Sequence, residues 1–236
     1  MLANRDYTLI VDKSGSMSQK DGLGGRTRWF SARESTEAFA RKCEELDPDG
    51  LTLYVFAGRF RRYDNVTADR VAQVFHENEP CGGTDLAGVL KHAFDAYFAR
   101  KARGEARPET ILVVTDGEPD DERSVIRVVV EASKKIQRDE ELAVSFIQIG
   151  SDPGARRFLK VLDDDLVRAG APFDICDTVT VDEMETMGLT RCSSVRSRTE
   201  SGRGRRWIGS VGAGGVRVGA ESLRVKPSSD AQSGFS

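Results

Sequence analysis

The feature that most constrains the fold of this chain is a regular alternation of short apolar runs with longer segments of helical character. Six runs have the length and the β-branched, apolar composition of strands, at residues 7–12, 51–56, 60–66, 110–115, 142–149 and 175–181. Helical segments follow most of them, at residues 29–46, 68–77, 85–100, 121–138 and 154–166. Because parallel strands need a long crossover, this order predicts an α/β fold: a doubly wound (Rossmann-like), mostly parallel six-stranded sheet with helices on both faces.

One pair of strands departs from the alternation. Ala57-Gly58-Arg59 alone separates strand 51–56 from strand 60–66, and a link of three residues has the length of a hairpin. We therefore expect strand 60–66 to run antiparallel to its neighbour at one edge of the sheet.

The composition changes after Thr190. The protein has 236 residues and a net charge of −3, yet residues 191–236 hold nine Lys or Arg, three Asp or Glu, eight Gly and ten Ser. A last helix is expected to begin at Asp182, but no apolar period continues beyond it. We predict one domain over residues 1–190 and a flexible, basic Gly/Ser/Arg-rich tail over 191–236. Nucleic-acid binding is conceivable for the tail alone, and the acidic body opposes it.

Several classes of protein are disfavoured by what the sequence lacks. No run of about 18 apolar residues predicts a membrane span, and the N-terminus has no apolar segment typical of a secretory signal, so we expect a cytoplasmic protein. The four cysteines (Cys43, Cys81, Cys176 and Cys192) lie far apart and are expected to be reduced and packed as small apolar groups. The two histidines lie in helical segments, which disfavours a zinc site or a catalytic triad.

Polar side chains gather where the predicted strands end. Asp12, Ser14 and Ser16 follow the first strand, Thr84 precedes a helix after two glycines, and Asp116 follows the fourth strand. Each has an ordinary structural interpretation, as a turn or a helix N-cap. Ligands of doubly wound sheets, however, bind beyond the carboxyl ends of the strands, where all three segments converge. Carboxylate and hydroxyl oxygens suit Mg²⁺, Mn²⁺ or Ca²⁺ and not zinc.

These residues resemble the motif of the von Willebrand factor A (vWA) family and its metal-ion-dependent adhesion site (MIDAS). The family pattern is Asp-x-Ser-x-Ser, then a Thr, then an Asp, and it matches Asp12, Ser14, Ser16, Thr84 and Asp116. The resemblance covers about residues 5–190. Val-Asp-Lys-Ser-Gly-Ser-Met at 11–17 and Val-Thr-Asp-Gly-Glu-Pro at 114–119 look closest to the small intracellular bacterial members, including those associated with tellurium resistance.

The resemblance implies a protein-binding module and not an enzyme. Ser14, Ser16 and Thr84 would bind one cation, Mg²⁺ or alternatively Mn²⁺ or Ca²⁺, through their hydroxyls, while Asp12 and Asp116 would act directly or through waters. Because neutral hydroxyls leave the cation short of negative charge, a solvent-facing position would attract an Asp or Glu side chain of a partner protein.

A second hypothesis is an enzyme, a Mg²⁺-dependent phosphohydrolase with Asp12 as nucleophile. Enzymes of the haloacid-dehalogenase type place a second Asp two residues later, where this chain has Ser14. Glu118, Asp120 and Asp121 follow Asp116 and are interpreted as a solvated loop and helix N-cap, with a role in partner choice or metal binding as the alternative.

Overall fold

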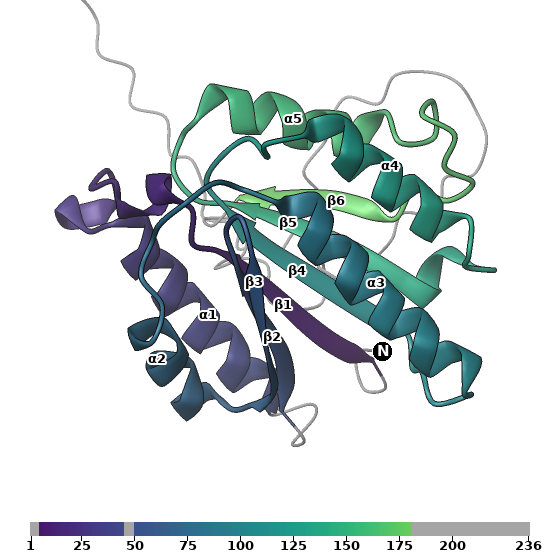
Figure 1. Ribbon diagram of the computed structural model, residues 1–236, viewed down its shortest axis with the longest axis horizontal. Helices are drawn as coiled ribbons and strands as arrows, with labels where there is room; N and C mark the ends of the chain where they lie inside the picture. Colours follow the sequence, from purple (N-terminus) through teal and green to yellow (C-terminus); the bar gives the residue numbers. More distant parts are fainter. Residues whose placement is uncertain (1–4, 45–49, 181–236) are drawn as a thin grey trace, which may run out of the picture. The chain divides into compact units, whose positions relative to one another are not determined.

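The computed structural model describes residues 5–44 and 50–180 of the chain, and within them a six-stranded sheet forms the centre (Figure 1). The strands are β1 (Asp6–Asp12), β2 (Leu51–Phe56), β3 (Phe60–Val66), β4 (Glu109–Thr115), β5 (Leu142–Gln148) and β6 (Cys176–Thr180). The α-helices of this part are α1 (Arg28–Glu44), α2 (Ala68–His76), α3 (Leu86–Ala102), α4 (Glu122–Ser133) and α5 (Pro153–Asp164). The predicted alternation of strands and helices is confirmed.

The strand order across the sheet is β3-β2-β1-β4-β5-β6. Every neighbouring pair is parallel except β2 and β3, whose antiparallel pairing confirms the predicted hairpin at the edge. The chain moves outward from β1 through β2 to β3, and then returns to place β4 on the other side of β1. Strand order therefore reverses between β1 and β4, and the carboxyl ends of these two strands define the switch point at which such sheets bind ligands.

Two apolar layers hold the helices on the sheet, because successive side chains of a strand point to opposite faces. Ile10 of β1 and Val113 of β4 pack in the layer formed with α3, α4 and α5. Leu9 and Leu112, one position away, pack in the layer formed with α1 and α2. Figure 1 shows these two groups of helices along opposite sides of the sheet, so the expected covering of both faces is confirmed.

The structure departs from the sequence-based expectation at the end of α4. This helix ends at Ser133, whereas its periodicity predicted about residue 138. The Ser133 hydroxyl donates to the carbonyl oxygen of Phe173 at 2.8 Å and accepts from the Phe173 N–H at 3.0 Å. The side chain of Ile136 is buried just beyond the helix. These tertiary contacts turn the chain away from the helix axis, which local periodicity does not reveal.

Smaller differences concern short turns and one cysteine. Short 3₁₀ helices form at Gly15–Ser18, Leu23–Gly25 and Asp139–Glu141, where loops or the end of a helix were expected. Cys43 and Cys176 are buried as expected, but Cys81 is exposed because it lies on a surface loop before α3. The predicted helix from 182 and the tail 191–236 lie outside the described residues. Among the described helices, none has the length and apolarity needed to cross a bilayer.

Candidate metal centre

Three loops meet at the carboxyl ends of β1 and β4. They comprise residues 13–18 after β1, residues 81–85 before α3, and residues 116–121 after β4. Backbone hydrogen bonds join them directly: the Gly15 N–H donates to the Gly82 carbonyl oxygen at 3.1 Å, and the Asp120 N–H donates to the Thr84 carbonyl oxygen at 3.1 Å. The three predicted segments therefore form one surface, with the middle loop bonded to both of the others.

Asp12 is the most enclosed of the predicted site residues. Its carboxylate is 0% exposed, and both oxygens accept hydrogen bonds. The Ser14 N–H donates to Oδ1 at 2.7 Å, and the Thr115 hydroxyl donates to Oδ2 at 2.7 Å. Burial raises the pKa of Asp12 to about 6, and the hydrogen bonds from Ser14 and Thr115 oppose that rise. Asp12 is thus a buried carboxylate held by neutral donors.

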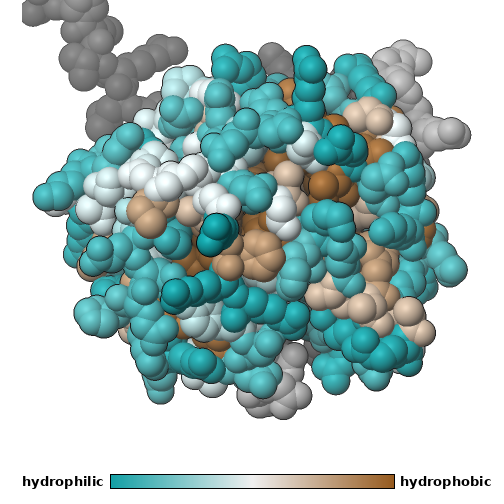
Figure 2. Space-filling model, viewed as in Figure 1, coloured by the Kyte–Doolittle hydropathy of each residue, from teal (hydrophilic) through white to brown (hydrophobic). Residues whose placement is uncertain are grey.

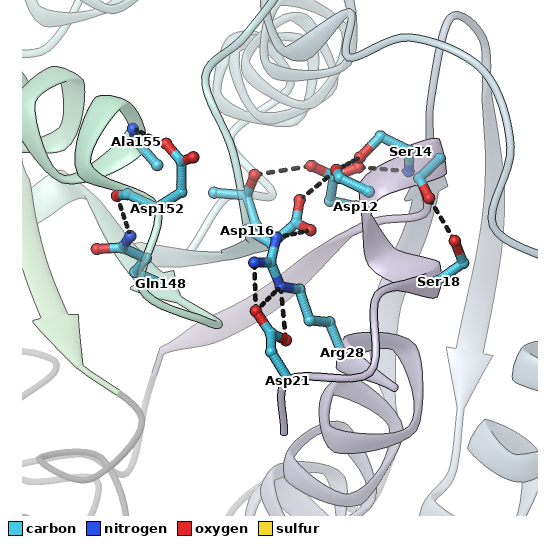
Figure 3. A network of polar contacts seen from close by, with 12 residues as sticks. Asp12, Ser14, Ser18, Asp21, Arg28, Asp116, Gln148, Asp152 and Ala155 are labelled. Carbon is cyan, nitrogen blue, oxygen red and sulfur yellow. Dashed lines mark hydrogen bonds and ion pairs between the residues drawn. The ribbon is translucent and has the colours of Figure 1, made fainter. Parts of the chain in front are cut away.

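A chain of hydroxyls connects the first loop to Asp116. The Ser14 and Ser16 hydroxyl oxygens lie 3.1 Å apart, and the Ser16 hydroxyl donates to Asp116 Oδ1 at 2.9 Å. Asp116 is also 0% exposed. Four of the five predicted site residues therefore belong to one continuous hydrogen-bond network, and Figure 3 labels three of them, Asp12, Ser14 and Asp116.

Thr84, the fifth predicted residue, reaches this network through its loop. It is buried, and its N–H donates to Asp120 Oδ2 at 2.8 Å. The next residue, Asp85, caps α3 by accepting from the Gly88 N–H. Two hydrogen bonds thus fix the backbone at Thr84 and at the residue after it, on the loop that is bonded to the loop after β1.

Arg28 is a site residue that sequence reasoning missed. Its Nη1 donates to Asp116 Oδ2 at 2.8 Å, and its Nε donates to Asp21 Oδ1 at 2.9 Å. Figure 3 shows the guanidinium group between these two carboxylates. The hydrogen bonds that Arg28 donates to Asp21 and to Asp116 raise the pKa of Arg28 above its ordinary value. One signal in the sequence was its position, since a cation in the first turn of a helix opposes the helix dipole.

The acidic residues after Asp116 have separate roles. Asp121 caps α4 by accepting from the Ser124 N–H at 3.0 Å, which confirms the N-cap interpretation. Glu118 forms an exposed ion pair with Arg157 at 3.0 Å. Asp120 instead joins the second and third loops through Thr84, a link that the sequence did not indicate.

The donor atoms at this centre fit a cation that prefers oxygen. Two buried carboxylates and the hydroxyls of two serines lie in one network, and a threonine lies on the loop bonded to it. Within residues 5–44 and 50–180, no group of three or more His, Cys, Asp or Glu side chains forms a metal cluster. A cation in this region would therefore need hydroxyl ligands beside its carboxylates, as Mg²⁺ and Mn²⁺ accept and zinc does not favour.

Gly83 offers a test of the contact between the second and third loops. A Cβ at Gly83 would lie 2.6 Å from Asp120 Oδ2, the atom that accepts the Thr84 N–H. Gly83→Ala is expected to displace Asp120, break this hydrogen bond and lower stability by about 1 kcal/mol, as measured by urea denaturation. Gly154→Ala is the matched control, because its Cβ would meet the end of the exposed Glu118 side chain, which can rotate into water. Equal stability of both variants would contradict the structural role of Asp120.

Comparison with known proteins supports the fold, and one family model matches part of the chain. Residues 7–118 match the family model described as von Willebrand factor type A domain. No curated protein sequence matches the chain. Three solved structures resemble it with a TM-score of 0.55: the SpRpn10 VWA domain, a mutant PilB minor pilin from Streptococcus sanguinis, and the manganese-loaded TRAP protein from Plasmodium vivax.

Sequence identity to these structures is 16%, 14% and 16%, respectively. The similarity covers 75%, 75% and 77% of this chain, and 88%, 57% and 70% of the three solved chains. At such identities the likeness concerns the fold. Residues 7–118 of this chain therefore match the von Willebrand factor type A family, and the described residues have the fold of a solved domain of that family.

Proposed function

We propose that this chain contains a vWA domain with a complete metal-ion-dependent adhesion site and binds a protein partner through one divalent cation. In this proposal Asp12, Ser14, Ser16, Thr84 and Asp116 hold Mg²⁺, with Mn²⁺ or Ca²⁺ as alternatives, and the cation grips an Asp or Glu side chain of the partner. The observation that carries the proposal is the Ser14–Ser16–Asp116 network, which joins residues 100 positions apart at the switch point of the sheet. The manganese-loaded TRAP structure, which shares the fold, supports a metal of this kind.

The charge of the centre favours an acidic partner. Asp116 already pairs with Arg28, so one of the two buried carboxylates is offset inside the protein. The serine and threonine hydroxyls are neutral and add no negative charge. A bound divalent cation would therefore keep excess positive charge at the protein surface, and a carboxylate from outside would supply the missing anionic ligand.

A hollow beside the centre supplies surface for the rest of a partner. It has a volume of about 310 Å³ and lies between the beginnings of α3 and α4, with Thr84 and Asp120 on its wall. Leu86, Lys91 and Val128 also line it. On the face that carries α3 and α4, Figure 2 shows apolar side chains among mostly hydrophilic ones. We propose that residues flanking the partner carboxylate contact this hollow.

The geometry does not favour the enzyme hypothesis. Both carboxylate oxygens of Asp12 accept hydrogen bonds, and the side chain is 0% exposed. A nucleophile needs an oxygen free to approach the phosphorus atom of a substrate. We therefore propose a binding protein, and we propose a cytoplasmic setting for it, as the resemblance of residues 11–17 and 114–119 to small intracellular bacterial vWA proteins implies.

Calorimetric titration with Mg²⁺ and Mn²⁺ tests the metal site. The full chain is expected to bind one cation, and Ser16→Ala is expected to weaken binding at least about tenfold, because it removes a ligand and the hydrogen bond to Asp116. Ser18→Ala is the matched control, since the Ser18 hydroxyl donates to the Gly15 carbonyl oxygen and is exposed. Equal loss in the two variants, or no binding by the wild type, would refute the assignment.

Partner binding is tested by affinity capture with and without chelator. A captured partner is expected to be released by EDTA while circular dichroism shows an unchanged fold. Thr84→Ala is expected to weaken capture at least about tenfold, whereas Thr67→Ala, at the exposed start of α2, is expected to leave it unchanged. A partner retained in excess EDTA would show that its interface lies elsewhere.

A further inference from the structure

Arg28 occupies an unusual place for a cation. It begins α1, its side chain is 8% exposed, and it contacts two carboxylates from different loops. Asp116 lies in the network of the metal centre and is 0% exposed, whereas Asp21 is 40% exposed. The guanidinium group thus connects the candidate metal site to a carboxylate at the protein surface.

The surroundings of Arg28 keep its side chain in place. The Arg28 N–H donates to the Gln19 carbonyl oxygen at 3.0 Å, which fixes the start of α1. A Cβ at Gly150, after β5, would lie 2.7 Å from Arg28 Nε and 3.0 Å from Cζ. Gly150 has φ +77°, a conformation that favours glycine, and the missing side chain leaves the space that the guanidinium group fills.

The two buried carboxylates of the centre repel each other when no metal is bound. Asp12 and Asp116 are both fully buried and are connected through Ser14 and Ser16, so their negative charges repel in a medium of low dielectric. Arg28 offsets this repulsion permanently, because its guanidinium group stays protonated at every pH relevant to a protein. A divalent cation entering the site would meet that positive charge and share Asp116 with it.

We propose that Arg28 is a built-in counter-cation of the metal centre, one that stabilises the metal-free site and weakens its affinity for divalent cations. This inference rests on the proposed function, since it concerns the same site. Arg28 also fixes the orientation of Asp116, because it binds Oδ2 while Ser16 binds Oδ1. Asp21 reduces the effect of Arg28 on metal affinity, because its negative carboxylate also binds the guanidinium group and offsets part of its positive charge.

The test compares Arg28→Gln, Arg28→Lys and Asp21→Asn in the full chain, with Mg²⁺ and Mn²⁺ titrations and thermal melts in EDTA and in saturating Mg²⁺. Arg28→Gln is expected to bind Mg²⁺ on the order of tenfold more tightly, because a positive charge near the ion is lost. Its melting temperature is expected to fall in EDTA and to recover in Mg²⁺ by more than the wild type gains. Arg28→Lys keeps the charge and is expected to bind Mg²⁺ with nearly wild-type affinity.

Asp21→Asn is expected to act in the opposite direction and weaken Mg²⁺ binding about threefold, since Arg28 then pairs with Asp116 alone and a nearby negative charge is gone. Unchanged or weaker binding by Arg28→Gln, or an equal fall in its melting temperature with and without Mg²⁺, would overturn the inference. If Arg28→Gln does not fold, the Mg²⁺ titration of Asp21→Asn tests the inference instead. An affinity of Asp21→Asn for Mg²⁺ equal to that of the wild type would then overturn the inference. A wild type that binds neither cation overturns the proposed function itself, whereas a binding wild type with unaltered variants overturns the role of Arg28 alone.

Discussion

In calorimetric titrations, the Asp12→Asn variant is expected to lose Mg²⁺ and Mn²⁺ binding by at least about 100-fold while keeping its fold. Asn has nearly the shape of Asp, so its side-chain oxygen can still accept the Ser14 N–H, and the Thr115 hydroxyl can turn to accept from the amide. The negative charge beside the cation disappears, and at short range that charge is worth several kcal/mol even with an effective dielectric constant near 20.

The same variant is expected to be more stable than the wild type when no metal is present. Burial raises the pKa of Asp12 to about 6 in the folded protein, above the ordinary value of about 3.9. Protonation of Asp12 therefore favours the fold, and this stabilisation is complete below about pH 4 and lost as the pH rises through 6. Asp12→Asn avoids that loss and should gain about 1–3 kcal/mol at pH 7.5.

Urea denaturation in EDTA measures this gain, which should vanish near pH 4. Asp152→Asn is the control for metal binding, because Asp152 is also an Asp after a parallel strand but accepts from the Ala155 N–H as the N-cap of α5. It is expected to bind Mg²⁺ like the wild type. An Asp12→Asn variant that is less stable than the wild type at pH 7.5 would show that the charge of Asp12 is compensated in a way the hydrogen bonds do not reveal.

Asp116→Asn is expected to lose metal binding to a similar extent but to destabilise the metal-free protein by about 2–3 kcal/mol. The difference arises from Arg28, whose buried guanidinium group loses its fully buried partner. Removing one member of a buried ion pair typically costs about 3–5 kcal/mol, because the other charge remains enclosed without compensation. Arg28 keeps its bonds to the half-exposed Asp21, so the expected cost lies below that range.

Thermal and urea denaturation in EDTA measure the effect of Asp116→Asn. The pair of variants is informative because the chemical change is the same at both positions, yet the expected shifts in stability have opposite signs. Equal stability changes would mean that Arg28 does not distinguish Asp116 from Asp12. A second substitution, Arg28→Gln in the Asp116→Asn background, should cost less than Arg28→Gln alone if the two residues are energetically coupled.

Local patterns carried most of the information about the fold. Strands 51–56 and 60–66 coincide with β2 and β3, and the hairpin between them followed from the length of one link. The predicted end of α4 was wrong because Ser133 bonds to Phe173, 40 residues away. The periodicity of a sequence does not indicate a contact of this kind.

The part of the candidate site that forms a sequence motif could be predicted from the sequence. The five motif residues were identified from their order, and the structure places four of them in one network, while their binding of metal stays a prediction. Arg28 and Asp21 escaped notice, and the link from Asp120 to Thr84 was not foreseen, because these roles arise from contacts between loops. Thr115 escaped because a buried threonine in a strand has the same pattern whether or not its hydroxyl binds a carboxylate.

The position of the centre between β1 and β4 also bears on how long the folded state lasts. These strands are neighbours in the sheet although residues 13–108 lie between them in the chain, so the Ser16–Asp116 contact joins groups of high sequence separation. Contacts of this kind form only after a long segment has been closed, which makes them slow to form. A cation bound there would leave the rate of folding almost unchanged and would slow unfolding, so its benefit to the protein would be a longer lifetime of the folded state.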